Sequence, residues 1–251
     1  MAVNRNSVVN IAGYKFEPLD DALDLIPVYQ QKCDELFLKG TMLISKNGIN
    51  FSVAGTPQAT DLFIEFIEKD IRFLNIPLKV TYSETQPYRR MKVRLKKEII
   101  SLGRKDIDPR QMTGERISPE AFKNILDRKE EVLVLDTRNE YETRVGKFEN
   151  AIDLQLDTFR DFPKAVESLP EEYKDKQIVM YCTGGIRCEK ASAVMMKAGF
   201  ANVKQLDGGV IEYFKETGGA YWEGDCFVFD ERVALDKELN ETEYIYCYIC
   251  R

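Results

Sequence analysis

The chain contains no histidine among its 251 residues. This absence excludes a Ser-His-Asp triad, a Cys-His dyad and every metal centre that histidine ligates. Long hydrophobic runs are missing as well, since no stretch approaches the roughly 18 consecutive apolar residues of a membrane span. The opening residues also lack the apolar core of a signal peptide. We therefore expect a soluble, cytoplasmic protein with no membrane partner.

Cysteine is sparse, with six residues at positions 33, 182, 188, 226, 247 and 250. Their irregular spacing is unlike the dense pattern of a small disulfide-bonded domain, so we expect reduced thiols. Cys247 and Cys250 have the spacing of zinc ligands, but a structural zinc site needs four. We therefore favour a frayed tail without metal over a site shared with Cys226 or with another subunit.

Hydrophobic residues make up 44% of the chain and charged residues 31%, which excludes wholesale disorder and allows buried cores. The length gives room for about two domains of roughly 100–150 residues each. Residues 1–110 carry a net charge of +3, whereas residues 111–251 carry −9. The two halves are therefore expected to face different partners.

Residues 1–102 show the pattern of a ferredoxin-like α+β domain with the order βαββαβ. The expected helices are 20–38 and 57–73, and the expected strands are 8–16, 41–45, 49–54, 78–83 and 91–100. The Asn47-Gly48 pair between two β-rich runs is a strong hairpin signal. A polar, turn-rich linker is expected over 103–117.

Residues 118–225 alternate strand and helix patterns, which indicates a parallel α/β sheet. Strands are expected at 132–135, 178–181 and 203–206, and helices from 118 and near 140–145, 159–169, 188–198 and 210–216. The segment 226–251 forms a C-terminal extension. The fold class is therefore α/β, with an α+β domain followed by a parallel α/β domain.

The sharpest chemical signal is a short loop between the second apolar strand and a helix. Its residues are Cys182, Thr183, Gly184, Gly185, Ile186 and Arg187. Such a loop aims backbone N–H groups and a helix N-terminus at the cysteine sulfur, which favours the thiolate, and Arg187 adds positive charge. Four residues separate Cys182 from Arg187, and so short a cradle suits a sulfur atom or a small group better than a phosphate. The alternative is that Cys182 is only a small buried residue at a strand end.

Cys188 lies beside this loop and allows two interpretations. It could resolve an oxidised or persulfidated Cys182 as a disulfide. It could equally be the first buried residue of the following helix, with its side chain pointing away from Cys182. We favour the second interpretation.

Two further segments complete a resemblance to the rhodanese superfamily. Asp136-Thr137-Arg138 follows the first apolar strand, and Gly208-Gly209 forms a closing turn. Rhodaneses carry a persulfide on a cysteine in a loop of this size. We expect Asp136 and Arg138 to brace the site, because ligands gather at the carboxyl ends of parallel strands.

The chain resembles more closely the rhodanese-domain tRNA uridine hydroxylases. The similar segments are 39–41, 48–50, 54–55, 90–93, 182–191 and 222–233. This resemblance implies hydroxylation of the wobble uridine of tRNA at carbon 5, with molecular oxygen as co-substrate. No cofactor motif is visible in the sequence, and no sequence feature indicates the oligomeric state. A sulfurtransferase that takes persulfide sulfur from a sulfur donor is the alternative, since both chemistries need a reactive cysteine.

A basic segment near the end of the first domain is the candidate RNA contact. Its expected contact residues are Arg89, Arg90, Lys92, Arg94 and Lys96. Strand alternation would align most of these charges on one face. A solvated edge strand explains the pattern equally well, but the family resemblance favours contacts with RNA phosphates. Trp222, the chain's single tryptophan, is expected to pack in the core rather than to stack on a base.

Overall fold

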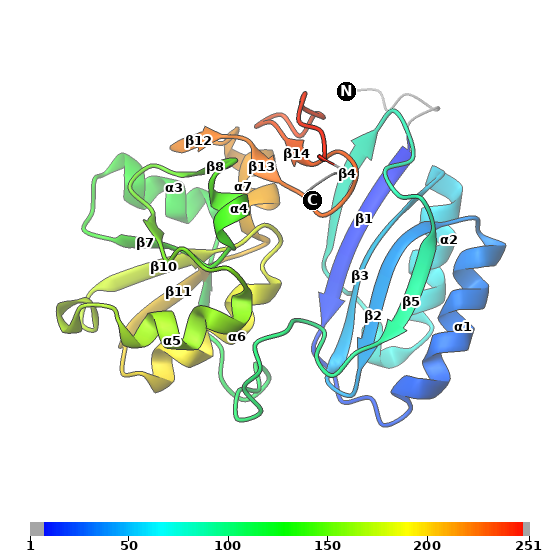
Figure 1. Ribbon diagram of the computed structural model, residues 1–251, viewed down its shortest axis with the longest axis horizontal. Coiled ribbons are helices and arrows are strands. Elements are labelled where there is room, and N and C mark those ends of the chain that lie inside the picture. The colour runs from blue at the N-terminus through cyan, green and yellow to red at the C-terminus, as the bar shows by residue number, and fades with distance from the viewer. Residues whose placement is uncertain (1–7, 248–251) are drawn as a thin grey trace. The chain divides into compact units, whose positions relative to one another are not determined.

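The computed structural model describes residues 8–247 and divides the chain between Ile100 and Ser101 into two compact units (Figure 1). We call these the N-terminal and the C-terminal unit. Within the described residues, none of the helices has both the length and the hydropathy needed to span a bilayer.

The N-terminal unit contains one five-stranded sheet. Its elements are β1 (Val8–Lys15), α1 (Ala22–Glu35), β2 (Lys39–Ser45), β3 (Gly48–Gly55), α2 (Pro57–Glu68), η1 (Ile71–Phe73), β4 (Leu78–Ser83) and β5 (Met91–Leu95). The strand order is β4-β1-β3-β2-β5, in which β5 runs parallel to β2 and the other pairs are antiparallel. The predicted ferredoxin-like order βαββαβ is thus confirmed, with β5 added at the edge.

Local chemistry explains the turns of this unit. Gly48 has φ +137°, and a Cβ there would lie 2.0 Å from the Lys15 carbonyl oxygen, so the β2-β3 hairpin needs glycine. Thr56 caps α2 by accepting a hydrogen bond of 3.2 Å from the Ala59 N–H. Helices α1 and α2 cover the same face of the sheet (Figure 1). There Phe51 and Phe63 meet edge to face in the buried core.

Two elements of this unit are shorter than predicted. The helix expected over 57–73 ends at Glu68, and Asp70 caps a separate turn, η1, by accepting from the Arg72 N–H at 3.0 Å. The strand expected to reach residue 100 ends at Leu95. Beyond it, Ile99 is buried and its carbonyl accepts a side-chain hydrogen bond from Asn50. The apolar residues after Leu95 therefore pack against the core without extending the strand.

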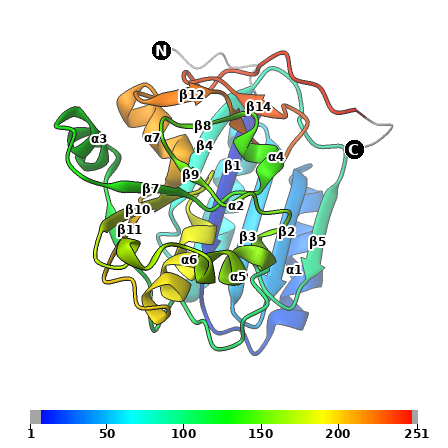
Figure 2. The same ribbon diagram turned by 60° about the vertical axis from the view of Figure 1, so that its left-hand side comes forward.

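The C-terminal unit is built on a parallel sheet in the order β6-β11-β10-β7-β9. Its elements are β6 (Glu115–Ile117), α3 (Pro119–Asp127), β7 (Leu133–Asp136), α4 (Glu140–Thr143), β8 (Gly146–Phe148), β9 (Ile152–Asp153), η2 (Phe159–Asp161), α5 (Phe162–Glu167), η3 (Glu171–Tyr173), β10 (Gln177–Tyr181), α6 (Ile186–Lys197), β11 (Asn202–Leu206), α7 (Gly209–Thr217), β12 (Trp222–Gly224), β13 (Cys226–Phe227) and β14 (Ala234–Leu235). Helices α5 and α6 lie on one face of the sheet, and α3 and α7 lie on the other (Figure 2). The predicted parallel α/β architecture is confirmed.

The last residues of the expected linker 103–117 belong to this sheet. Glu115–Ile117 form β6, which pairs with β11. The N–H of Gly114 donates to Ser192 Oγ at 2.8 Å, and the side chain of Gln205 donates to the Gly114 carbonyl. A three-residue edge strand is too short to show a periodic pattern, so the sequence pattern predicts a loop there.

The segment expected as an extension after residue 225 is partly core. Cys226, Val228 and Leu235 are buried in the same hydrophobic cluster as Phe148 and Trp222. Trp222 is 2% exposed, as expected for a core residue. Short strands with few residues each form this segment, and their positions depend on the core beneath them.

Candidate active site

The loop of Cys182 joins the end of β10 to the start of α6. Helix α6 begins at Ile186, two residues earlier than expected, so Arg187 lies in its first turn. The turn before α7 closes the loop, since the N–H of Val210 donates to the Cys182 carbonyl at 3.0 Å. At Gly209, with φ +69°, a Cβ would lie 2.4 Å from that same carbonyl oxygen. The close approach of the two turns therefore requires glycine.

The sulfur of Cys182 is fully buried and is bound by its own loop. The Gly185 N–H donates to Sγ at 3.1 Å, where Gly185 has φ +95°. Burial by itself raises the pKa of this thiol. The Cys188 hydrogen bond, the charge of Arg187 and backbone N–H groups outweigh burial and lower the pKa to about 5. The direction of this pKa shift favours the thiolate, in agreement with the prediction from the loop pattern.

Cys188 does not point away from Cys182, and this corrects the interpretation that we favoured from the sequence. It is buried in the first turn of α6, and its thiol hydrogen-bonds to Cys182. Burial, this hydrogen bond and the Cys182 charge raise the pKa of Cys188 well above its ordinary value. Thr137 Oγ1 lies 3.7 Å from its sulfur. The two pKa shifts run in opposite directions and favour a thiolate at Cys182 beside a neutral thiol at Cys188.

Arg187 is paired with a carboxylate that the sequence did not single out. Its Nη1 and Nη2 donate to Glu142 at 2.5 and 2.7 Å, and both side chains are buried. Glu142 also accepts from Thr183 Oγ1 at 3.2 Å and from the Asn139 N–H at 3.1 Å. Arg187 thus serves Cys182 by its charge, while its guanidinium is oriented by Glu142. Glu142 stands six residues after Asp136, and an acid that close to the Asp-x-Arg segment was the available signal.

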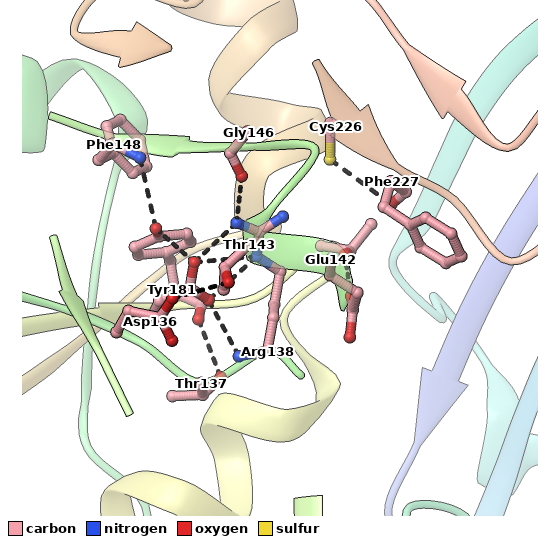
Figure 3. Close-up of polar contacts among 12 residues, drawn as sticks. Asp136, Thr137, Arg138, Glu142, Thr143, Gly146, Phe148, Tyr181, Cys226 and Phe227 are labelled. Atoms are coloured by element: carbon pink, nitrogen blue, oxygen red, sulfur yellow. Dashed lines mark hydrogen bonds and ion pairs between the residues drawn. The ribbon is translucent and has the colours of Figure 1, made fainter. Parts of the chain in front are cut away.

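Asp136 and Arg138 form a fully buried pair at the end of β7, near the loop but outside it (Figure 3). Arg138 Nη2 donates to Asp136 at 2.6 Å and to the Gly146 carbonyl at 2.6 Å. The Tyr181 hydroxyl donates to Asp136 Oδ2 at 2.6 Å. Because Tyr181 directly precedes Cys182, this network fixes the strand end from which the loop departs.

Phe227 and Phe229 are site neighbours that the sequence did not reveal. The Arg187 guanidinium lies 5.8 Å from the centroid of the Phe229 ring. Phe229 in turn meets Phe227 edge to face at 5.2 Å. Both lie in the family-like segment 222–233, but no local pattern places that segment near Arg187, and only the packing of β13 and the turn after it brings them to the loop.

The basic segment lies partly on β5, at an edge of the N-terminal sheet. Met91 and Val93 pack against the core, so alternation directs Lys92 and Arg94 to the opposite face. The charges of Arg90 and Arg94, together with some burial, lower the pKa of Lys92. Like charges are therefore crowded at this edge. The predicted RNA contacts remain Arg89, Arg90, Lys92, Arg94 and Lys96.

The frayed tail without metal, which we expect at Cys247 and Cys250, stays a prediction. Cys247 is exposed, whereas Cys250 lies outside the described residues. Cys226 is buried, and burial raises its pKa to about 12. A neutral, enclosed thiol of this kind suits a packing role.

Comparisons with known proteins cover both units. Residues 8–99 match the family described as UPF0176 acylphosphatase like domain, and residues 118–216 match the rhodanese-like domain. A Burkholderia cenocepacia protein named tRNA uridine(34) hydroxylase is 42% identical over 254 residues, which cover 98% of this chain and 89% of that protein. A Cupriavidus metallidurans protein of the same name is 43% identical over 249 residues, which cover 97% of this chain and 88% of that protein.

Among solved structures, the rhodanese-like domain of an Anabaena protein is 23% identical and covers 45% of this chain and 80% of that chain, with a TM-score of 0.36. The similarity to the named relatives extends through both units, including the Cys182 loop. The chain therefore belongs to the family of the tRNA uridine(34) hydroxylases.

Proposed function

We propose that this chain hydroxylates carbon 5 of the wobble uridine, position 34 of tRNA, with molecular oxygen as co-substrate and Cys182 as the reactive group. The observation that carries the proposal is the Cys182 thiolate loop in a chain whose relatives, similar over 98% of its length, are named for this reaction. The substrate is accordingly tRNA.

Cys182 would act as a nucleophile toward the uracil ring. Its Sγ forms a bond to carbon 6, and the electron pair of the 5,6 double bond moves onto the carbon 4 oxygen as an enolate. Carbon 5 then attacks one oxygen of a hydroperoxide, which forms when a two-electron reductant such as a dithiol reduces molecular oxygen. The O–O bond breaks, the new hydroxyl stays on carbon 5, and the second oxygen leaves as hydroxide. Loss of the carbon 5 proton and expulsion of the thiolate restore the double bond and the enzyme. A pKa of about 5 supports both steps, because Cys182 is ionised at neutral pH and leaves readily.

Rhodanese-type sulfur transfer is the second candidate, and the same loop supports it. A thiolate bound by the Gly185 N–H and the Cys188 thiol could also carry a persulfide from a sulfur donor. The basic edge of the N-terminal unit favours tRNA over a small thiol acceptor, because clustered Lys and Arg bind phosphate backbones.

The two chemistries leave different products. Unmodified tRNA is incubated with the full chain and a two-electron reductant such as a dithiol under isotopically labelled oxygen gas, with and without a sulfur donor. The tRNA is then digested to nucleosides for mass spectrometry. We expect labelled 5-hydroxyuridine without a donor. Donor-dependent thiouridine without 5-hydroxyuridine would instead establish sulfur transfer.

Variants test the role of Cys182 in the same assay. Cys182→Ser should abolish the product, because a serine hydroxyl is not ionised at neutral pH. Cys247→Ser is the matched control, since Cys247 is exposed and in the tail, and it should retain activity. Undiminished 5-hydroxyuridine from Cys182→Ser would remove this residue from the mechanism.

A further inference from the structure

Three aromatic side chains form a connected cluster beside the Cys182 loop. Tyr141 and Phe227 meet edge to face at 5.2 Å, and Phe227 and Phe229 do the same at 5.2 Å. Phe227 is buried beside Glu142 (Figure 3), whereas Tyr141 is 45% exposed and Phe229 is 58% exposed. The cluster therefore has a buried centre and two rings that reach solvent.

The Phe229 ring lies next to Arg187, and Arg187 in turn acts on the reactive Cys182. The Arg187 guanidinium lies 5.8 Å from the ring centroid and is one of the charges that lower the pKa of Cys182. This cation–π contact accounts for part of the ring surface. More than half of the side chain still faces solvent, next to the thiolate site.

The exposure of Phe229 does not come from a loose loop. The turn between β13 and β14 is closed by the Val228 N–H, which donates to the Val233 carbonyl at 2.8 Å. Asp230 and Arg232 form a buried ion pair within it at 2.6 Å, with side chains only 3% and 5% exposed. A large apolar ring is thus held outward by a rigid turn, at a cost in hydrophobic free energy. Fixed exposed rings of this kind are suited to binding.

We propose that Phe229, flanked by Tyr141, is the stacking surface for the target uracil. This inference rests on the proposed function, because it assigns the binding surface of the same uracil whose carbon 6 is to react with Cys182. Bases of single-stranded loops can leave their stack and lie on aromatic faces. A pyrimidine ring on Phe229 would lie beside Arg187, which contacts Phe229 and acts on Cys182. Trp222 cannot serve, since it is 2% exposed.

The first test measures stacking without turnover. In Phe229→Trp the full chain carries a reporter indole at the cluster, and it is titrated with an anticodon stem-loop that has uridine at position 34. We expect quenching of the reporter by this RNA and little quenching by the same stem-loop with an abasic position 34. The unchanged protein is the control, because its single tryptophan, Trp222, is buried. Equal quenching by both RNAs would overturn the proposal.

The second test uses the hydroxylation assay. Loss of one base–aromatic stack should lower kcat/KM of Phe229→Ala by about 5- to 150-fold, mainly through KM, while Phe229→Tyr stays near the wild type. Tyr244→Ala is the matched control, because Tyr244 is an aromatic side chain of the same unit with 47% exposure. An unchanged kcat/KM in Phe229→Ala, with active wild type, would reject the stacking surface and leave the proposed function intact. Base-dependent quenching with an inactive wild type would support stacking and count against the function.

Discussion

Arg187 and Glu142 form a two-bond ion pair in the interior of the C-terminal unit, with N–O distances of 2.5 and 2.7 Å. Their side chains are 6% and 0% exposed. The guanidinium that stabilises the Cys182 thiolate is therefore oriented by a carboxylate on α4, a helix far from the loop in sequence. This pair connects the stability of the unit to the chemistry of the sulfur.

Glu142→Gln should destabilise the protein by about 3–5 kcal/mol, because it leaves Arg187 buried without its counter-charge. Urea denaturation measures the loss. Glu140→Gln is the control on the same helix, since Glu140 pairs with Arg144 at the surface and such pairs contribute at most about 1 kcal/mol. Similar losses of stability in both variants would show that the buried pair contributes no more to the free energy of unfolding than the surface pair does.

The advantage of wild type over Glu142→Gln should depend on pH. Burial raises the pKa of Glu142, but Arg187 outweighs burial, so the pKa in the folded state is lowered. A lowered pKa gives a stabilisation that is fully present above the unfolded value, roughly 4.3, and is lost as pH falls through the folded value. The stability difference should therefore shrink on acidification. A difference that stays constant from pH 7 to pH 3 would contradict this account.

Cys182 should titrate with a midpoint near 5, because its neighbours stabilise the thiolate. Ultraviolet absorbance of the thiolate follows the titration, with Cys182→Ser as the blank. Cys188→Ala should raise the midpoint, because it removes a hydrogen-bond donor to the sulfur. Activity should fall as pH drops through 5, where the thiolate is protonated. A midpoint near 8.5, that of an ordinary thiol, would contradict the prediction.

Asp136→Asn should cost about 3–5 kcal/mol in the free energy of unfolding, because Arg138 is fully buried and loses its charge partner. Asp108→Asn is the matched control. Asp108 and Arg110 repeat the Asp-x-Arg geometry at a partly exposed position. Denaturant unfolding should find the control within about 1 kcal/mol of the wild type, and equal effects would reject the role of burial.

Charge reversal of Arg90, Lys92 and Arg94 should weaken tRNA binding and reduce its dependence on salt. Each lost phosphate contact lowers the slope of log K against log salt by about 0.7–0.9, so three contacts lower it by about 2–3. Filter binding at several salt concentrations measures the slope. The control reverses three exposed lysines that are scattered over the chain, Lys46, Lys69 and Lys129, and so matches the change in net charge. The same slope change in both variants would mean that net charge alone acts.

The sequence by itself determined the order of the main strands and helices and the position of the reactive loop. Hydrophobic periodicity and turn residues act over a few neighbouring residues, so they can be read locally. The Cys182 loop is also a local object, since a strand end, two glycines and a helix start follow one another along the chain.

Only the tertiary structure decided what surrounds the loop. Glu142 reaches Arg187 from 45 residues away, Cys188 turns toward Cys182, and Phe229 is presented by a turn after the expected domain end. Short elements such as β6 and β13 carry too few residues for a periodic signal. These contacts depend on how helices and turns pack around the common sheet, and a linear pattern does not encode which distant side chains share one buried volume.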